Sequence, residues 1–312
     1  MAAAEHQLRI AVLLPCYNEE AAIVRTIEGF RAALPGASIY VYDNNSSDRT
    51  VDVARAAGVE VRTERMQGKG NVVRRMFADV DADIYLMADG DLTYDPAAAA
   101  AMIKLLIDDR LDMVVGTRLH DASDAYRGGH VLGNRVFTGL LSGLFGRSFS
   151  DIFSGYRVFS RRFVKSFPVL SEGFEIETEI SVHALELRMP VGEVETAYGA
   201  RPEGSESKLS TFRDGWRILK TIATLYRIER PVLFYGSIGA LLLIAAIILS
   251  IPLVLTYLDT GLVPRFPTAI LATGLVIIAV LCFFAGLILD TVTRGRREMR
   301  RLAYLSQPGA SA

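Results

Sequence analysis

The chain has 312 residues, a formal net charge of −1 and 51% apolar residues. A nearly neutral chain gives no electrostatic reason to expect nucleic-acid binding. With only two cysteines, Cys16 and Cys282, a disulfide scaffold is excluded. Residues 1–9 are polar and lack the apolar core of a signal peptide, so we expect the N-terminal part to remain in the cytosol.

The first part of the chain alternates short apolar runs with helical patterns. We expect strands at residues 9–14, 38–42, 59–63, 84–88 and 113–117. Helices are expected between them, at about residues 19–34, 51–57, 68–80 and 96–109. Strands that alternate with helices at this spacing predict an α/β domain with a largely parallel sheet.

Two carboxylates, Asp89 and Asp91, directly follow the apolar run at residues 84–88. Open α/β sheets bind ligands at the carboxyl ends of their strands. Carboxylates this close repel each other unless a cation lies between them, and a divalent ion that shares its shell with substrate phosphates would fit. The alternative is an ordinary acidic turn, because Asp and Gly are common turn residues.

Three further polar loops, at residues 15–19, 43–48 and 68–70, follow strands or open helices of the same domain. They should converge on the same edge of the sheet. Their chemistry suits a nucleoside diphosphate, because carboxylates can hold ribose hydroxyls, Lys69 can neutralise phosphate, and glycines let backbone N–H groups approach. Residues 68–70 lack the spacing of a Walker A loop.

The pattern changes after residue 128. Residues 132–149 read as an amphipathic helix, either packed against the core or lying in a membrane interface. A helix at 174–187 begins with Glu175, Glu177 and Glu179, and a strand is expected at 191–197. Residues 211–228 combine an apolar stripe with a basic face, which favours a helix on the membrane surface.

Two apolar runs, residues 233–258 and 268–289, are each long enough to span a bilayer. The short linker at 259–267 predicts a hairpin, with two buried core helices as the alternative. Arginines flank the hairpin on the side of the chain ends, and the positive-inside rule therefore places both termini in the cytosol. The expected organisation is a domain over 1–210, an interface helix over 211–230, a hairpin over 231–293 and a basic cytosolic tail over 294–312.

The ordered series of loops, with Asp151-Ile-Phe-Ser-Gly-Tyr-Arg and Ser207-Lys208-Leu209 downstream, resembles glycosyltransferase family 2. It is most similar to the polyisoprenyl-phosphate glycosyltransferases, the branch that includes dolichyl-phosphate mannose synthase and bacterial undecaprenyl-phosphate glycosyltransferases. The resemblance covers about residues 10–228 and extends in layout to the hairpin. It implies the Rossmann-like, mostly parallel GT-A fold on the cytosolic face of the cytoplasmic membrane, followed by interface helices and a transmembrane hairpin. Relatives often form tetramers, so a homo-oligomer is also implied.

The resemblance assigns functions to individual residues. The nucleotide-sugar donor would be bound by Pro15, Tyr17, Glu19, Asp43, Lys69 and Asp89. Mg²⁺ or Mn²⁺ would be bound by Asp89 and Asp91. The donor and acceptor phosphates would be surrounded by Arg118, Arg135, Arg201 and Lys208. Catalysis would depend on Asp151 and Asp91. One position departs from the mannose synthases, since Thr93 stands where they carry a metal-contacting Gln.

The implied activity is that of a metal-dependent inverting hexosyltransferase. A sugar would pass from a nucleotide donor, UDP rather than GDP, to a membrane polyprenyl phosphate by direct in-line attack. Asp151 matches the aspartate that the family offers as a catalytic base, and here it would orient the reactants more than remove a proton. One alternative is a processive polysaccharide synthase, but the Gln-x-x-Arg-Trp motif of those enzymes is missing and two spans provide little material for a channel. Another is a non-catalytic membrane-anchored scaffold, against which the intact Asp89, Asp91 and Asp151 argue.

Overall fold

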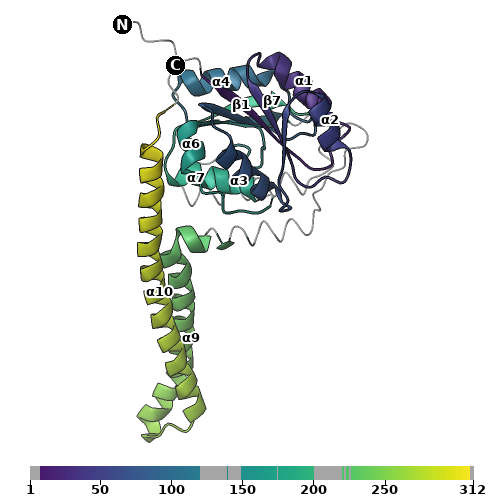
Figure 1. Ribbon diagram of the computed structural model, residues 1–312. Helices are drawn as coiled ribbons and strands as arrows, with labels where there is room; N and C mark the ends of the chain where they lie inside the picture. The colour runs from purple at the N-terminus through teal and green to yellow at the C-terminus, as the bar shows by residue number, and fades with distance from the viewer. Residues whose placement is uncertain are drawn as a thin grey trace, which may run out of the picture. The chain divides into compact units, whose positions relative to one another are not determined.

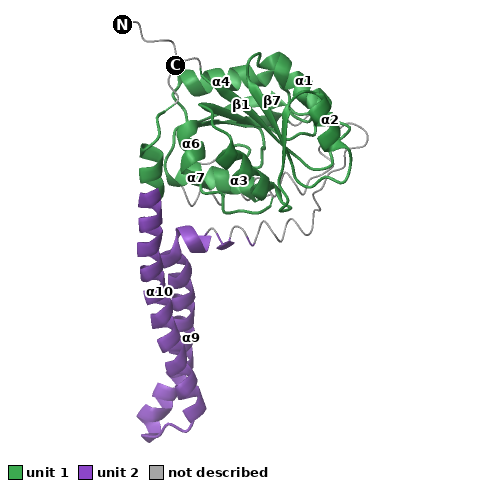
Figure 2. Ribbon diagram, in the orientation of Figure 1, with its two compact units in different colours: residues 1–215, 300–312 green, residues 216–299 purple. Residues whose placement is uncertain are grey.

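The computed structural model describes residues 8–119, 139, 149–173, 175–199, 220, 223–224 and 226–309. The chain divides into two compact units, one of residues 1–215 with 300–312 and one of residues 216–299 (Figure 2). The expected interface helices at 132–149 and 211–228 lie almost entirely outside the described residues.

A seven-stranded sheet with the order β3-β2-β1-β4-β6-β5-β7 forms the centre of the first unit. Its strands are β1 (Ile10–Cys16), β2 (Ser38–Asp43), β3 (Glu60–Thr63), β4 (Ile84–Met87), β5 (Met113–Leu119), β6 (Arg157–Ser160) and β7 (Val191–Ala197). All neighbouring pairs are parallel except those of β6, which runs antiparallel to both β4 and β5. The mostly parallel sheet expected from the sequence is therefore confirmed, with one strand, β6, that the sequence did not predict.

Helices cover both faces of this sheet (Figure 1). One face carries α1 (Ile23–Ala33), α2 (Thr50–Ala56) and α4 (Ala98–Asp108), and the other carries α3 (Lys69–Asp79), α6 (Arg161–Ser166) and α7 (Ile176–Glu186). In α1 the buried side chains Ile23, Ile27 and Phe30 recur at helical spacing, so one stripe faces the sheet. They join a core built from fully buried strand residues such as Val12 and Leu86.

The register of the sheet brings the candidate loops together. Cys16 at the end of β1 pairs with Asp43 at the end of β2, and β4 lies on the other side of β1. Because β6 is antiparallel, its first residue Arg157 pairs with Met87, the last residue of β4. The loop before β6 therefore lies at the same edge as the loops after the parallel strands.

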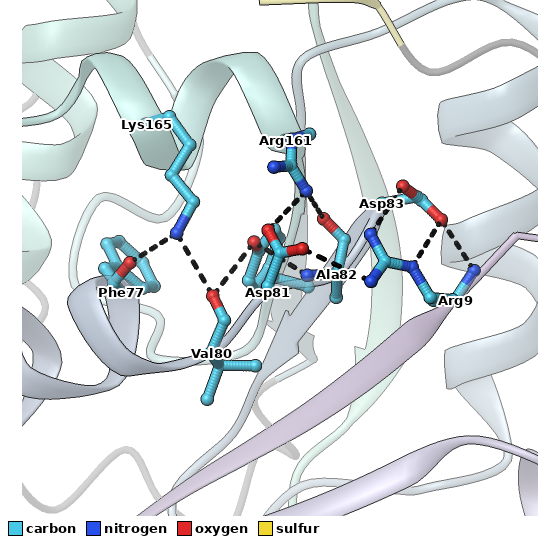
Figure 3. A network of polar contacts seen from close by, with 9 residues as sticks. Arg9, Phe77, Val80, Asp81, Ala82, Asp83, Arg161 and Lys165 are labelled. Atoms are coloured by element: carbon cyan, nitrogen blue, oxygen red, sulfur yellow. Dashed lines mark hydrogen bonds and ion pairs between the residues drawn. The ribbon is translucent and has the colours of Figure 1, made fainter.

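The opposite edge is closed by charged side chains that bind backbone and one another (Figure 3). Arg9 contacts both Asp81 and Asp83, and Arg161 contacts Asp81 and the Ala82 carbonyl oxygen. Lys165 donates to the carbonyl oxygens of Phe77 and Val80, at the end of α3. Cations suit the carbonyl-rich end of a helix. These contacts fix the connection between α3 and β4.

A second polar cluster is centred on Asp112, which is fully buried just before β5. Its carboxylate accepts hydrogen bonds from the Ser160 hydroxyl (2.7 Å), from the Arg162 guanidinium and from the Tyr304 hydroxyl (2.8 Å). Tyr304 lies in the C-terminal segment 300–312, which belongs to the first unit. That segment is thus attached to the α/β domain by buried polar contacts.

The second unit contains α9 (Pro231–Thr260) and most of α10 (Phe266–Leu305). Both are long and apolar enough to cross a membrane, and only 17% of the most apolar window of each is buried. The two helices approach closely, because a Cβ added to Gly239 would lie 2.9 Å from the Ala279 carbonyl oxygen. Small residues allow such backbone approach between membrane helices. The exposure argues for a candidate membrane hairpin and against buried core helices.

We predict that Asp112→Ala destabilises the protein by about 3–5 kcal/mol, because it leaves the Arg162 guanidinium without its buried partner. Urea unfolding of the variant and the wild type in the same detergent should show this as a lower midpoint urea concentration for the variant. The matched control is Asp108→Ala, which removes an exposed carboxylate paired with Lys104 on the same helix and should change little. Equal effects of the two substitutions on stability would contradict the assignment of Asp112 as a buried stabilising partner.

Candidate active site

The acidic pair after β4 is held in two different environments. The Asp89 side chain is 29% exposed, whereas Asp91 is buried. Asp91 Oδ1 accepts hydrogen bonds from the Thr93 backbone N–H (3.2 Å) and hydroxyl (2.6 Å). Leu92 between them has a φ of 61°, so the backbone turns tightly here. Thr93 thus orients the Asp91 carboxylate.

Asp89 forms an ion pair with Lys69 in the first turn of α3. Lys69 Nζ lies 2.5 Å from Asp89 Oδ1 and 2.6 Å from Glu177 Oε1 in the first turn of α7. Burial alone would lower the pKa of Lys69, but the two carboxylates raise it above its ordinary value, so the ammonium stays charged. The sequence placed Glu177 only near a helix start. The signal that marked it was the run of three acidic residues at alternate positions, Glu175, Glu177 and Glu179, at the expected helix start.

The glycines beside Lys69 allow close packing against the loop before α7. A Cβ on Gly68 would lie 2.1 Å from the Glu172 carbonyl oxygen, and a Cβ on Gly70 would lie 2.2 Å from that of Ser171. Their N–H groups are bonded within the protein, Gly68 to Asn44 Oδ1 and Gly70 to the Glu172 carbonyl oxygen. The sequence suggested that these amides face a phosphate, whereas in the structure they fix the start of α3.

Arg118 at the end of β5 forms a bidentate ion pair with Asp151. The Nε–Oδ2 and Nη2–Oδ1 distances are 2.7 and 2.8 Å, and the guanidinium lies over the Tyr198 ring at 5.4 Å. Burial would raise the pKa of Asp151, but the hydrogen bonds and charge of Arg118 outweigh it and hold that pKa below its ordinary value. Asp151 is therefore an ionised, oriented carboxylate.

The loop that carries Asp151 is supported from beneath by a fully buried arginine. Arg157 donates to the carbonyl oxygens of Ile152 (2.6 Å) and Ser154 (2.8 Å), and burial lowers its pKa to about 10. The Gly155 N–H donates to the Tyr94 hydroxyl (2.8 Å). A Cβ on Gly155 would lie 3.0 Å from Asp89 Oδ2, so the loop passes directly beside the acidic pair.

The loops after β1 and β2 bind each other. The Asp43 carboxylate accepts from the backbone N–H groups of Asn45 (3.1 Å) and Ser46 (3.2 Å), and the Glu19 N–H donates to the Thr50 hydroxyl (2.8 Å). Pro15 lies within β1, opposite Tyr42 of β2, and Tyr17 is half-buried just after that strand. These positions border the same edge as Asp89. Their assignment to the base and ribose stays a prediction.

The structure therefore places Asp89, Asp91, Lys69, Arg118 and Asp151 at one edge of the sheet. Three of the residues predicted to bind phosphate, Arg135, Arg201 and Lys208, lie outside the described residues.

The donor set fits a divalent cation that takes most of its ligands from a substrate. Among the described residues, no group of three or more His, Cys, Asp or Glu side chains is placed to hold a metal ion by itself. Asp89 and Asp91 supply hard carboxylate oxygens, which suit Mg²⁺ or Mn²⁺ shared with phosphates. Asp89, being partly exposed, is the more accessible of the two.

Comparisons with known proteins agree with this geometry. The model of glycosyl transferase family 2 matches residues 11–167. Glycosyltransferase AglJ of Haloferax volcanii is 34% identical over 74% of this chain and 76% of its own length. A dolichyl-phosphate hexose transferase of the same organism is 28% identical, over 71% and 95% of the two chains. The resemblance drawn from the sequence motifs is thus confirmed.

A solved structure shares the fold of the domain. Glucosyl-3-phosphoglycerate synthase of Mycobacterium tuberculosis, in complex with Mn²⁺, UDP and phosphoglyceric acid, has a TM-score of 0.58 and 23% identity. The match covers 70% of this chain and 78% of that one. The expected GT-A fold is confirmed by this likeness.

We predict that Gly70→Ala destabilises the protein by about 1–3 kcal/mol, because its Cβ would overlap the Ser171 carbonyl oxygen. Alanine ordinarily favours a helix over glycine, so the sign identifies the steric contact. Gly295→Ala is the matched control, since that helical glycine has open space around it. Thermal unfolding should separate the two variants, and a neutral Gly70→Ala would contradict the packing described.

Proposed function

This chain belongs to glycosyl transferase family 2, and we propose that it transfers a sugar from a nucleotide-sugar donor to a membrane polyprenyl phosphate. One observation carries the proposal: a chain with a glycosyltransferase site also has two long apolar helices that are largely exposed. A lipid-linked acceptor would be held by such helices near the membrane surface. The name of the related dolichyl-phosphate hexose transferase supports the same acceptor class.

UDP is the favoured nucleotide. Support comes from the fold relative whose structure contains Mn²⁺ and UDP. In this chain Asp89 and Asp91 would hold Mg²⁺ or Mn²⁺. Such a cation, when bound, neutralises charge on the diphosphate leaving group. Pro15, Tyr17, Glu19 and Asp43 border the space in which the nucleoside would lie.

The reaction requires little proton transfer by the protein. A lipid monophosphate is largely dianionic at pH 7, because its second pKa is about 6. One of its oxygens would form a bond to the anomeric carbon while the bond from that carbon to the donor's diphosphate oxygen breaks, with inversion. No proton has to leave the attacking oxygen. Most of the rate acceleration would therefore come from holding donor and acceptor in line.

Asp151 would orient the reactants, since the ion pair with Arg118 keeps it ionised and limits its motion. Arg118 is 19% exposed, and its guanidinium would contact an incoming phosphate beside this loop. Arg135, Arg201 and Lys208 are proposed to complete the phosphate contacts. The catalytic domain and both termini are proposed to lie in the cytosol, at the cytoplasmic membrane.

The decisive experiment presents purified protein with UDP-sugars, GDP-sugars and a short polyprenyl phosphate. Polyprenol without phosphate and 3-phosphoglycerate serve as matched acceptors. We expect transfer only to the lipid phosphate, with inverted anomeric configuration by NMR. Loss of even one charge-assisted phosphate contact lowers affinity about ten- to a hundredfold. Transfer to polyprenol should therefore be weaker than transfer to polyprenyl phosphate by at least that factor.

Other outcomes would identify other functions. Equal transfer to 3-phosphoglycerate would replace the lipid acceptor by a soluble phosphate ester. Products with many sugars would indicate a processive synthase, and binding of donor without any turnover would indicate a scaffold.

A pH profile tests the assigned state of Asp151. Its lowered pKa keeps it ionised as the pH falls, so in the wild type only the acceptor phosphate should limit the rate between about pH 7 and pH 5. Arg118→Gln removes the group that lowers this pKa and leaves burial, which raises it. We predict that the rate of Arg118→Gln relative to wild type falls steadily as the pH is lowered. Arg118→Lys retains the charge and should keep a more constant ratio, whereas a flat ratio for Arg118→Gln would contradict the assignment.

A further inference from the structure

Glu177 is a buried carboxylate at the candidate site for which the reaction described above gives no role. Its side chain is 6% exposed, and its ion-pair partner among the described residues is Lys69, at 2.6 Å. A carboxylate is buried at high cost unless it is paired. The start of α7 thus carries a charge that is compensated from α3.

The two carboxylates on Lys69 differ in their access to solvent. The Asp89 side chain is 29% exposed, whereas the Glu177 side chain is 6% exposed. An incoming cation therefore reaches Asp89 more readily than Glu177. The shared ammonium has one partner that can leave and one that stays.

The ammonium itself is confined. A Cβ on Gly155 would lie 3.1 Å from Lys69 Nζ, so backbone packs against it on one side. The start of α3 is fixed by hydrogen bonds from Gly68 to Asn44 Oδ1 and from Gly70 to the Glu172 carbonyl oxygen. The Lys69 side chain is 10% exposed, so its ammonium still needs a carboxylate partner when Asp89 binds elsewhere.

We propose that Glu177 is a positioning residue of the donor site, which retains the Lys69 ammonium when Asp89 is transferred from Lys69 to the cation of the donor. The inference rests on the proposed function, because it presumes a donor that brings a divalent cation. Without Glu177, the ammonium has Asp89 as its remaining carboxylate partner and competes more strongly with the cation. The local negative charge that attracts the cation is also smaller by one.

The test measures cation binding directly. Free Mn²⁺ is followed by electron paramagnetic resonance while Mn²⁺, alone and with UDP, is titrated into wild type, Glu177→Gln and Glu179→Gln. Glu179 is the matched control, since it lies in the same helix but accepts from the backbone N–H groups of Leu170 and Ser171. We expect Glu177→Gln to raise the Mn²⁺ dissociation constant by about tenfold or more, and Glu179→Gln to change it less than about twofold. Turnover of Glu177→Gln at saturating Mn²⁺ should fall much less than its Mn²⁺ affinity.

A double-mutant cycle, measured by thermal unfolding without metal, tests the pairing of Lys69 with Glu177. Lys69→Met removes the ion-pair partner of the buried Glu177 and should lower the melting temperature. Adding Glu177→Gln to Lys69→Met should recover part of that loss, because the uncompensated charge is removed. A double variant no more stable than Lys69→Met would overturn the proposed pairing.

The outcomes separate the two proposals. If the wild type binds Mn²⁺ with UDP and Glu177→Gln binds it equally well, the role of Glu177 is refuted while the proposed function stands. If the wild type itself binds no Mn²⁺ in the presence of UDP, both the cation-dependent function and this inference fail.

Discussion

Compensation of buried charge at one edge of the sheet is the constraint on which the rest of the site depends. Asp89 and Glu177 share Lys69, and Asp151 is paired with Arg118. Each pair joins segments that are distant in the chain, so the pairs hold α3, α7, β5 and the loop before β6 in one arrangement. A buried carboxylate without its cation would cost several kcal/mol. A charged ligand that binds at this edge would therefore compete with ion pairs that are already formed.

The antiparallel strand β6 explains how a mostly parallel sheet brings Asp151 to this edge. In a purely parallel sheet, all segments that precede a strand lie at one edge and all segments that follow a strand lie at the opposite edge. Because β6 is reversed, the segment before Arg157 lies beside the segment after Met87. Gly155 permits the close contact with Asp89, and Arg157 supports the turn from below. The motif that begins at Asp151 is thus one structural unit. Asp151 belongs to the candidate site, while Gly155 and Arg157 shape and support the loop.

Much of this fold follows from local sequence patterns, while the pairing inside the site does not. Apolar runs ending in polar loops identified β1 to β5, and Asp89 and Asp91 were located at a strand end from that pattern alone. The strand β6 was missed because Arg157 to Ser160 has neither a long apolar run nor alternation, although all four residues are buried. Nothing local to Lys69 indicates that its partner is Glu177, and nothing local to Arg118 indicates Asp151. Those pairs depend on strand order, which apolar periodicity does not specify.

For the C-terminal arginines too, the sequence gives the number of charges, whereas the fold determines which partners they have. Topology rules count the basic residues that follow an apolar span. In the folded chain some of these residues have protein partners: Arg297 is paired with Glu229 inside the second unit, and Arg300 with Glu186 inside the first. Arg301 also donates to the Leu187 carbonyl oxygen, at the end of α7. These charges are partly neutralised by protein and contribute less to lipid headgroup binding than their number suggests. The proposed orientation therefore depends on the charges during membrane insertion, before the partners in the folded domain are available.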